Sequence, residues 1–308
     1  NNKIVGAVDT ASLTVSSTNV AIGNSAGETT QGVQAVSLGA RAGQTTQGNN
    51  ATAIGADAGN SSQGANATAI GGGSAQVSQG EGAVAIGYLA GETTQGASSV
   101  AIGKEAGLTS QGTESVAIGL LAGKLNQGSQ TIAIGSEAGR DDQGANGIAL
   151  GHESGLADQA EFGIAIGEKA GRINQGIRGI GIGRSSGQTN QGTKAVAIGD
   201  AAGYATQGAN AIAIGEKAGE TNQAANSIVI NATGTETNNT TASSLVITPI
   251  RSAVGTTIMM YDAGTGEVTH TASPAITGDF TGSVCGDDST LLVDGVNNKI
   301  VGAVDTAS

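Results

Sequence analysis

A short alternating hydrophobic motif recurs along most of the chain, sixteen residues from one copy to the next. In the first copy Val20, Ala21 and Ile22 alternate in size and Gly23 ends the run. Alternation with a period of two is typical of a β-strand, and glycine of the turn that follows it. We therefore predict fourteen stacked copies of one short strand, starting at Val20, Val36, Thr52, Thr68, Val84, Val100, Val116, Ile132, Ile148, Ile164, Ile180, Val196, Ile212 and Ile228.

A glutamine stands in the second half of each repeat with the same spacing. Between motif and glutamine lies a small pair such as Ala26-Gly27, and Gly32 follows the first glutamine. Each repeat thus predicts two strands and two turns. Stacked amides can bond to one another, so we predict a structural ladder rather than a ligand site. Its members are Gln31, Gln47, Gln63, Gln79, Gln95, Gln111, Gln127, Gln143, Gln159, Gln175, Gln191, Gln207 and Gln223.

The two faces of the motif strand differ in size. Its third residue is Ile or Leu in every copy, whereas its middle residue is Ala in eleven of the fourteen. Alanine is a poor strand former, so we expect close packing on that face, for example against another chain. We expect the large residues to form the core inside the coil, with the members Val20, Ile22, Ile54, Ile86, Ile102, Ile118, Ile134, Ile166, Ile198 and Ile214.

These patterns predict an all-β fold, a parallel β-roll or β-solenoid of sixteen-residue coils. Fourteen coils at about 4.8 Å would span about 65–70 Å. Burying one Val and one Ile stabilises a coil by about 3–6 kcal/mol. Ordering sixteen residues costs about 16–30 kcal/mol, before hydrogen bonding is counted. Stacking and oligomerisation are therefore both expected.

Composition narrows the classes of protein. Aromatic residues are 2% of the chain and prolines number two, so the core is thin and a collagen helix is excluded. The net charge of -12 argues against nucleic acid and against docking on anionic membranes. No apolar run is long enough to insert into a membrane. Cys285 is the only cysteine, so an internal disulfide is impossible.

The sequence offers no candidate catalytic, cofactor-binding or metal-binding residues. His152 and His270 are far apart and fall on different predicted elements. No Cys and His residues have the spacing of a metal site, and no Ser or Thr stands beside a plausible base. We therefore expect a protein that is not an enzyme and needs no cofactor.

The repeated Val-Ala-Ile-Gly-x-x-Ala-Gly resembles the head repeat of trimeric autotransporter adhesins of the YadA-like type. The resemblance covers about residues 20–230. It implies a left-handed parallel roll and a homotrimer around one axis. The period departs from that family, in which it is nearer fourteen residues, and the Gln-Gly turn is additional.

The segment after the roll resembles the corresponding segment of bacteriophage tail fibres and other viral fibres. It contains two strand-like runs around Ala263-Gly264-Thr265-Gly266, which predict a hairpin. We predict a connector over residues 1–19, the roll over 20–243, a hairpin segment over 244–274 and a small β connector over 275–308. Residues 1–12 and 297–308 are identical, so we expect one period of a longer tandem array.

The function expected from these features is a structural fibre or adhesin shaft on a virion, as a tail fibre, or on a cell surface. It would hold a binding tip away from the particle, with itself and a host receptor or glycan as partners. A bacterial extracellular filament or surface adhesin is the alternative. An ice-binding solenoid is less favoured, because the threonine column of Thr29, Thr45 and Thr93 is interrupted. A polysaccharide-degrading spike is disfavoured by the few aromatics.

Overall fold

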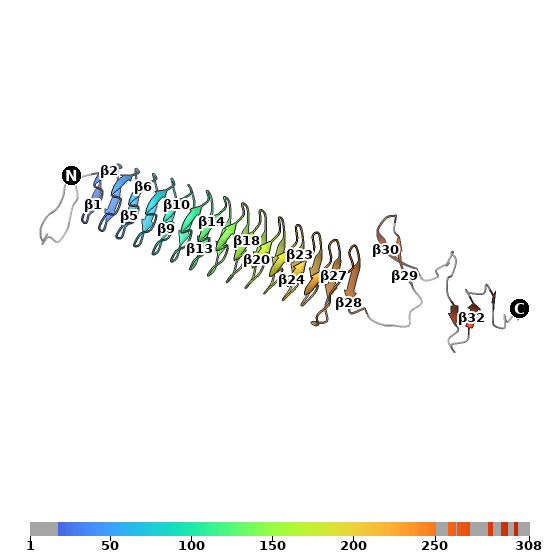
Figure 1. The fold of residues 1–308 in the computed structure, drawn as a ribbon. Helices are drawn as coiled ribbons and strands as arrows, with labels where there is room; N and C mark the ends of the chain where they lie inside the picture. Colours follow the sequence, from blue (N-terminus) through green and yellow to red (C-terminus); the bar gives the residue numbers. More distant parts are fainter. Residues whose placement is uncertain are drawn as a thin grey trace. The chain divides into compact units, whose positions relative to one another are not determined.

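A computed structural model describes residues 18–250, 258–262, 264–271, 283–285, 291–294 and 299–300. The chain divides into two compact units, Asn1–Ile250 and Arg251–Ser308. The first unit is a β-solenoid of sixteen-residue coils, each with two short strands and two turns (Figure 1).

The first strand of every coil belongs to one parallel sheet, here called sheet A. Its members pair in sequence order along the roll. They are β1 (Val20–Ile22), β3 (Val36–Leu38), β5 (Thr52–Ile54), β7 (Thr68–Ile70), β9 (Val84–Ile86), β11 (Val100–Ile102), β13 (Val116–Ile118), β15 (Ile132–Ile134), β17 (Ile148–Leu150), β19 (Ile164–Ile166), β21 (Ile180–Ile182), β23 (Val196–Ile198), β25 (Ile212–Ile214), β27 (Ile228–Asn231) and β28 (Leu245–Thr248).

The second strand of each coil belongs to a second parallel sheet, sheet B, which each glutamine strand enters in the same register. Its members are β2 (Thr29–Gln31), β4 (Thr45–Gln47), β6 (Ser61–Gln63), β8 (Val77–Gln79), β10 (Thr93–Gln95), β12 (Thr109–Gln111), β14 (Leu125–Gln127), β16 (Asp141–Gln143), β18 (Ala157–Gln159), β20 (Ile173–Gln175), β22 (Thr189–Gln191), β24 (Ala205–Gln207) and β26 (Thr221–Gln223).

Equivalent residues of neighbouring coils pair directly, as Val84 does with Val100. The turns stack as well. The Glu105 amide donates to the Tyr88 carbonyl over 2.9 Å, and the Ser98 amide donates to the Glu81 carbonyl over 2.8 Å. Backbone hydrogen bonds therefore run parallel to the roll axis in strands and turns alike. The predicted all-β solenoid and its sixteen-residue period are confirmed, while handedness and the number of chains stay predictions.

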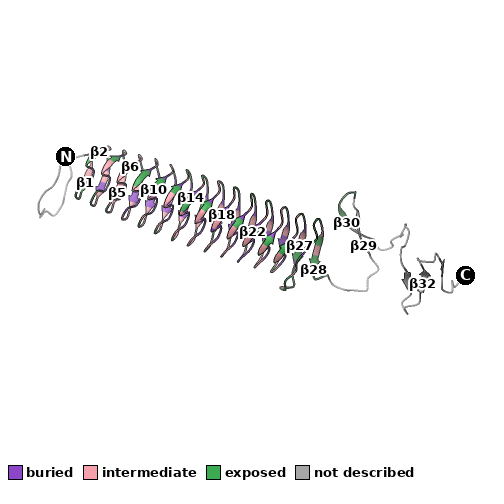
Figure 2. Cartoon of the chain, in the orientation of Figure 1, coloured by how far each residue is buried: buried purple, intermediate pink, exposed green. Residues whose placement is uncertain are grey.

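The interior of a coil is narrow and holds small residues and one amide. In the coil that starts at Val84, the buried side chains are Ala85, Ala90, Gln95 and Ser99. Figure 2 shows buried residues recurring along the roll. The alanines of successive coils form one cluster from Ala42 to Ala149 and a second cluster that begins at Ala197. Alanine on both sides leaves just enough width for a glutamine side chain between the sheets.

The predicted core was therefore wrong about which face of the strand lies inside. The alanines point inward, and the Val and Ile residues point outward, where they are partly or largely exposed. The expected packing of the alanine face against another chain is wrong for the same reason. The misplaced residues are Val20, Ile22, Ile54, Ile86, Ile102, Ile118, Ile134, Ile166, Ile198 and Ile214.

Left-handed backbone conformations shape the corners of each coil. Five residues have positive φ in each coil between residues 20 and 227, and in all of these coils but one only two of the five are glycine. In the coil that starts at Val100 they are Gly103, Glu105, Gly107, Ser110 and Glu114. A left-handed conformation costs a non-glycine residue about 1–2 kcal/mol. The repeated axial hydrogen bonds must offset that strain in each coil.

The glutamine column ends in the last coil, where an asparagine replaces the glutamine. Asn239 takes the glutamine's place, and its Nδ2 donates to the Ser244 carbonyl over 3.3 Å within its own turn. The shorter amide is accompanied by a larger residue, Val229, at the place of the inner alanine, and Val246 packs against it. Val229 thus fills the space that Asn239 leaves, and Pro249 after β28 has no amide to extend the ladder.

The second unit contains two antiparallel sheets. One is the hairpin of β29 (Ile258–Asp262) and β30 (Glu267–Thr271), which confirms the predicted hairpin. The other comprises β31 (Ser283–Cys285), β32 (Leu291–Asp294) and β33 (Lys299–Ile300). The predicted end of the roll at residue 243 was too early, because β28 still pairs with β27. Residues 1–17 and 301–308 lie outside the described residues, so the connector at the start and the tandem period stay predictions.

Ion pairs connect the exposed turns of different coils. Arg41 Nε lies 2.6 Å from Asp57 Oδ1 on the next coil, and Arg172 Nε lies 2.6 Å from Glu153 Oε2 on the preceding one. The hydrogen bond from Arg172 lowers the pKa of Glu153, and the bond from Arg41 lowers that of Asp57. These ion pairs join neighbouring coils on the outer surface of the roll, in addition to the backbone hydrogen bonds along its axis.

The lowered pKa values predict weaker folding in acid. A carboxyl whose pKa is lower in the folded state stabilises it above the unfolded pKa, about 4, and this stabilisation is lost as pH falls through the folded pKa. We expect Glu153→Gln to reduce the fall of the thermal midpoint between about pH 5 and about pH 2. Glu81→Gln is the control, because the Glu81 carboxylate takes part in no ion pair among the described residues. Parallel curves for wild type and Glu153→Gln would contradict the prediction.

Candidate association face

The outward side of sheet A carries two columns of aliphatic side chains, here called the aliphatic face. Because the middle residue of each strand points inward, its first and third residues point outward. Neither column contains a charged residue. The first column is Val20, Val36, Thr52, Thr68, Val84, Val100, Val116, Ile132, Ile148, Ile164, Ile180, Val196, Ile212 and Ile228, and the third residues are Ile22, Leu38, Ile54, Ile70, Ile86, Ile102, Ile118, Ile134, Leu150, Ile166, Ile182, Ile198, Ile214 and Ile230.

These side chains are accessible on the single chain. Leu150 is 41% exposed in the middle of the roll and Ile214 is 39% exposed near its end. The other members of the two columns between these coils are intermediate or exposed (Figure 2). The face therefore continues without a polar gap, apart from the hydroxyls of Thr52 and Thr68 near the first coils.

The aliphatic face lies at the upper end of the apolar patch sizes that monomers expose. Fourteen coils at about 4.8 Å, two side chains wide, give on the order of 600 Å². The largest apolar patch of a typical monomer is about 300–600 Å², whereas one partner in a stable interface contributes about 800 Å². An uncharged apolar surface of this extent is typical of an interface.

The outward side of sheet B has the opposite character. Its exposed middle residues are Thr, Ser, Asn or Asp, as at Thr94, Asn126 and Asp158. Asn126 Nδ2 donates to Asp142 Oδ1 on the next coil over 2.8 Å. Val77 and Leu125 are exposed apolar residues of sheet B, but they lie three coils apart, so within residues 18–250 the continuous apolar surface is the one on sheet A.

The predicted glutamine ladder is confirmed, with interruptions. Every glutamine Nε2 donates across its own coil to the carbonyl of the first sheet A residue, as Gln175 does to Ile164 over 2.8 Å. Nine glutamines also donate to the next Oε1, namely Gln47, Gln63, Gln79, Gln127, Gln143, Gln159, Gln175, Gln191 and Gln207. The Oε1 atoms of Gln111 and Gln127 have no partner. Gln31 bonds instead to Ser37 Oγ, which donates to Gln47.

The ladder is inaccessible to ligands, since Gln175 is 1% exposed. Within the described residues, no three of His, Cys, Asp and Glu gather in a group that could hold a metal ion. His152 Nε2 lies 3.6 Å from Glu153 on an exposed turn. No helix able to cross a membrane occurs in the described part of the chain.

Comparisons with protein-family models, with curated proteins and with solved structures found no match. The surfaces of the roll are therefore the features that indicate a function. Sequence reasoning missed the outward aliphatic face. The signal that could have indicated it is the small residue, usually glycine, that recurs four residues before each glutamine. A Cβ at Gly91 would lie 2.8 Å from Gln95 Oε1, so the glycine of the first turn leaves space for an inward amide.

Proposed function

We propose that this protein is a non-enzymatic structural fibre or adhesin shaft whose chains associate through the aliphatic face. The observation that carries the proposal is the uncharged apolar surface along sheet A, which only the hydroxyls of Thr52 and Thr68 interrupt. Covering it with the same surface of other copies removes the exposure in every coil at once. Three chains around one axis are expected from the resemblance to trimeric adhesin heads.

The roll suits a spacer because its bonds run along its axis. Backbone hydrogen bonds in both sheets and both turns hold successive coils together. Most neighbouring coils are also joined by the glutamine column, and some by ion pairs. A pull along the axis is shared among many parallel bonds per coil. Such a shaft would hold a binding tip away from a virion or a cell surface, and a bacterial extracellular filament is the alternative setting.

The test is the mass of the chain in solution. We expect the 308-residue protein to sediment at three times the chain mass of 29.6 kDa. Replacing Ile118 and Ile134 together by aspartate places charges on the aliphatic face, so the assembly should dissociate to single chains. Ser110→Asp with Asn126→Asp adds the same charge on sheet B and should leave the assembly intact.

The outcomes separate the parts of the proposal. A wild-type mass of 29.6 kDa would contradict association. A dimer that the Ile118 and Ile134 substitutions dissociate would retain the face and exclude the trimer. Dissociation by the sheet B variant alone would place the contact on the wrong side of the roll.

A further inference from the structure

One stretch of the roll surface departs from the chemistry of the repeat. The third residue of the second turn, stacked coil upon coil, is here called the turn column. It is Asn, Gln, Ser, Gly or Glu in all coils except three in succession, which carry Phe162, Arg178 and Lys194. The column comprises Gln34, Asn50, Asn66, Gly82, Ser98, Glu114, Gln130, Asn146, Phe162, Arg178, Lys194, Asn210 and Asn226.

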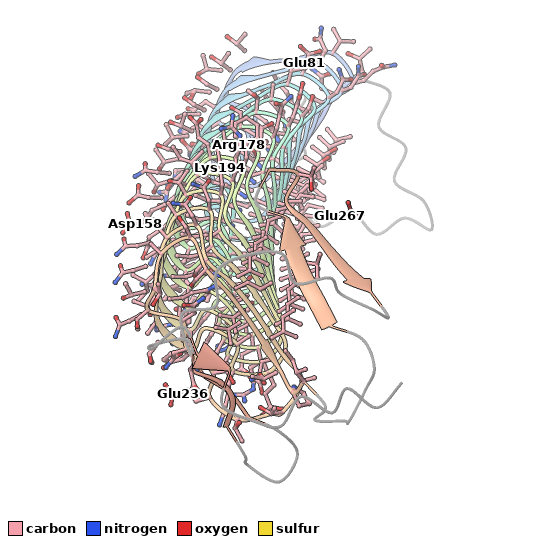
Figure 3. The ribbon with its side chains drawn as sticks, turned by 90° about the vertical axis from the view of Figure 1, so that its right-hand side faces the viewer. Glu81, Asp158, Arg178, Lys194, Glu236 and Glu267 are labelled. Atoms are coloured by element: carbon pink, nitrogen blue, oxygen red, sulfur yellow. The ribbon has the colours of Figure 1, made fainter. Side chains whose placement is uncertain are left out.

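The backbone places these three side chains one coil apart. The Arg178 amide donates to the Glu161 carbonyl over 3.1 Å, and the Lys194 amide donates to the Ile177 carbonyl over 2.9 Å. Figure 3 labels Arg178 and Lys194 next to each other. Ile177 stands beside Arg178 in the neighbouring column. We call Phe162, Ile177, Arg178 and Lys194 the cationic-aromatic patch.

The patch combines exposed apolar surface with positive charge. Phe162 is 45% exposed and Ile177 is 43% exposed. The guanidinium carbon of Arg178 lies 5.3 Å from the centroid of the Phe162 ring, the distance of a cation–π contact. Ring, methyls and cations thus lie on one exposed edge of the roll.

The two cations have no carboxylate partner, although the chain is strongly acidic. Neither Arg178 nor Lys194 takes part in an ion pair within residues 18–250. By contrast Arg41, Arg140, Arg172 and Arg184 all do. Glu161 stands beside Phe162 in sequence and is the one acid in the two columns over these three coils. The local excess of positive charge is therefore available to an anionic ligand.

The backbone at the patch is also unfavourable for the residues that it carries. All three have positive φ, which is 59° at Phe162. A bulky side chain there is a true outlier, whereas asparagine tolerates this conformation, and other coils use it. The left-handed conformation recurs at this position throughout the turn column, so the patch differs from the other coils in its side chains and not in its backbone.

We infer that the cationic-aromatic patch binds an acidic polysaccharide, a chain of uronic or sialic acid units. Successive coils lie about 4.8 Å apart, comparable to the length of one sugar ring, so a linear glycan along the axis meets one coil per unit. The apolar face of a ring packs on Phe162 and Ile177. Arg178 and Lys194 donate to carboxylates of the following units, as charge-assisted bonds.

An acidic polysaccharide fits better than other anions. Duplex nucleic acid and anionic membranes present broad surfaces of negative charge, which the net charge of -12 repels outside the patch. A polysaccharide strand is thin enough to contact this one edge. The inference uses one chain's turn and does not depend on association through the aliphatic face.

The experiment measures binding of polygalacturonate to the full chain, with its methyl ester as the uncharged control ligand. We expect the acid to bind at least about tenfold more tightly than the ester, and the binding to weaken with salt. In the triple variant, Phe162, Arg178 and Lys194 are all replaced by asparagine, the residue that the neighbouring coils carry at this position as Asn146 and Asn210. This variant should bind at least about tenfold more weakly, with an equal or higher thermal midpoint.

Two further variants keep the test specific. Arg178→Gln with Lys194→Gln retains the ring and should lose only the preference for the acid. Lys217→Asn removes a partly exposed cation elsewhere on the roll and should bind as wild type does. Absence of wild-type binding, equal binding of acid and ester, or equal binding by the triple variant would overturn the inference. A triple variant that changes only the sedimentation mass would show a contact between chains instead, which also overturns it.

Discussion

Replacing Gln175 by alanine is expected to lower the free energy of unfolding by about 3–5 kcal/mol, since buried groups lose partners and a cavity is left. The Gln175 Nε2 bonds to the Ile164 carbonyl and to Gln191 Oε1 would be lost, and Gln159 would lose its acceptor. Alanine neighbours cannot move far enough to fill the space. Denaturant unfolding followed by circular dichroism, at one protein concentration, measures the change.

Gln111→Ala is the matched control. Gln111 is buried equally well, at 2% exposed, and crosses its coil to the Val100 carbonyl over 2.9 Å. Its Oε1 has no partner, and neither does that of Gln127, the next glutamine. Gln111→Ala should therefore cost about 1–3 kcal/mol less than Gln175→Ala. Equal losses would mean that the bonds along the column contribute nothing beyond the bond across the coil.

Gly103→Ala should destabilise the roll by about 3 kcal/mol or more, because backbone strain and a backbone clash coincide. Gly103 follows strand β11 and has φ at 129°. A Cβ there would lie 2.5 Å from the carbonyl oxygen of Gly119 on the next coil. That oxygen belongs to the stacked backbone and cannot yield without separating two coils.

Gly107→Ala tests the same substitution where it is tolerated. The added Cβ would lie 2.8 Å from Gln111 Oε1, the end of a flexible side chain. The chain itself places Ala75 at the equivalent position, with φ at 46°. We expect a loss of only about 1–2 kcal/mol, the cost of the left-handed conformation. If both variants unfold at the same denaturant concentration, the proposed backbone clash is wrong.

The repeat made much of this fold predictable. A spacing that never shifts between Gln31 and Gln223 requires equivalent residues to stack, and alternation at Val20-Ala21-Ile22 requires a strand. The hairpin around Gly264 was predictable from its turn residues and flanking strands. The end of the roll was predictable only in part. Leu245-Val246-Ile247 resembles the strand motif, but Leu245 follows Ile228 by seventeen residues and the period is broken there.

The candidate surfaces were only partly predictable. The sequence alone shows that the turn column carries Phe162, Arg178 and Lys194 at the repeat spacing. The exposure of Phe162 and the contact between its ring and the Arg178 guanidinium come from the structure. The aliphatic columns were identified and placed on the wrong side. Large apolar residues usually lie inside, and that general preference misled the prediction.

By itself, the sequence determined the period, the strands, the turns and the alignment of like residues, because each depends on spacing along one chain. Only the tertiary structure decided that Ala85 and Gln95 face inward while Val84 and Ile86 face outward. Alternation defines two faces of a strand without saying which one is enclosed. Closing sixteen residues into a coil with left-handed corners leaves an interior too narrow for opposed aliphatic side chains, and the backbone's closure settles the choice.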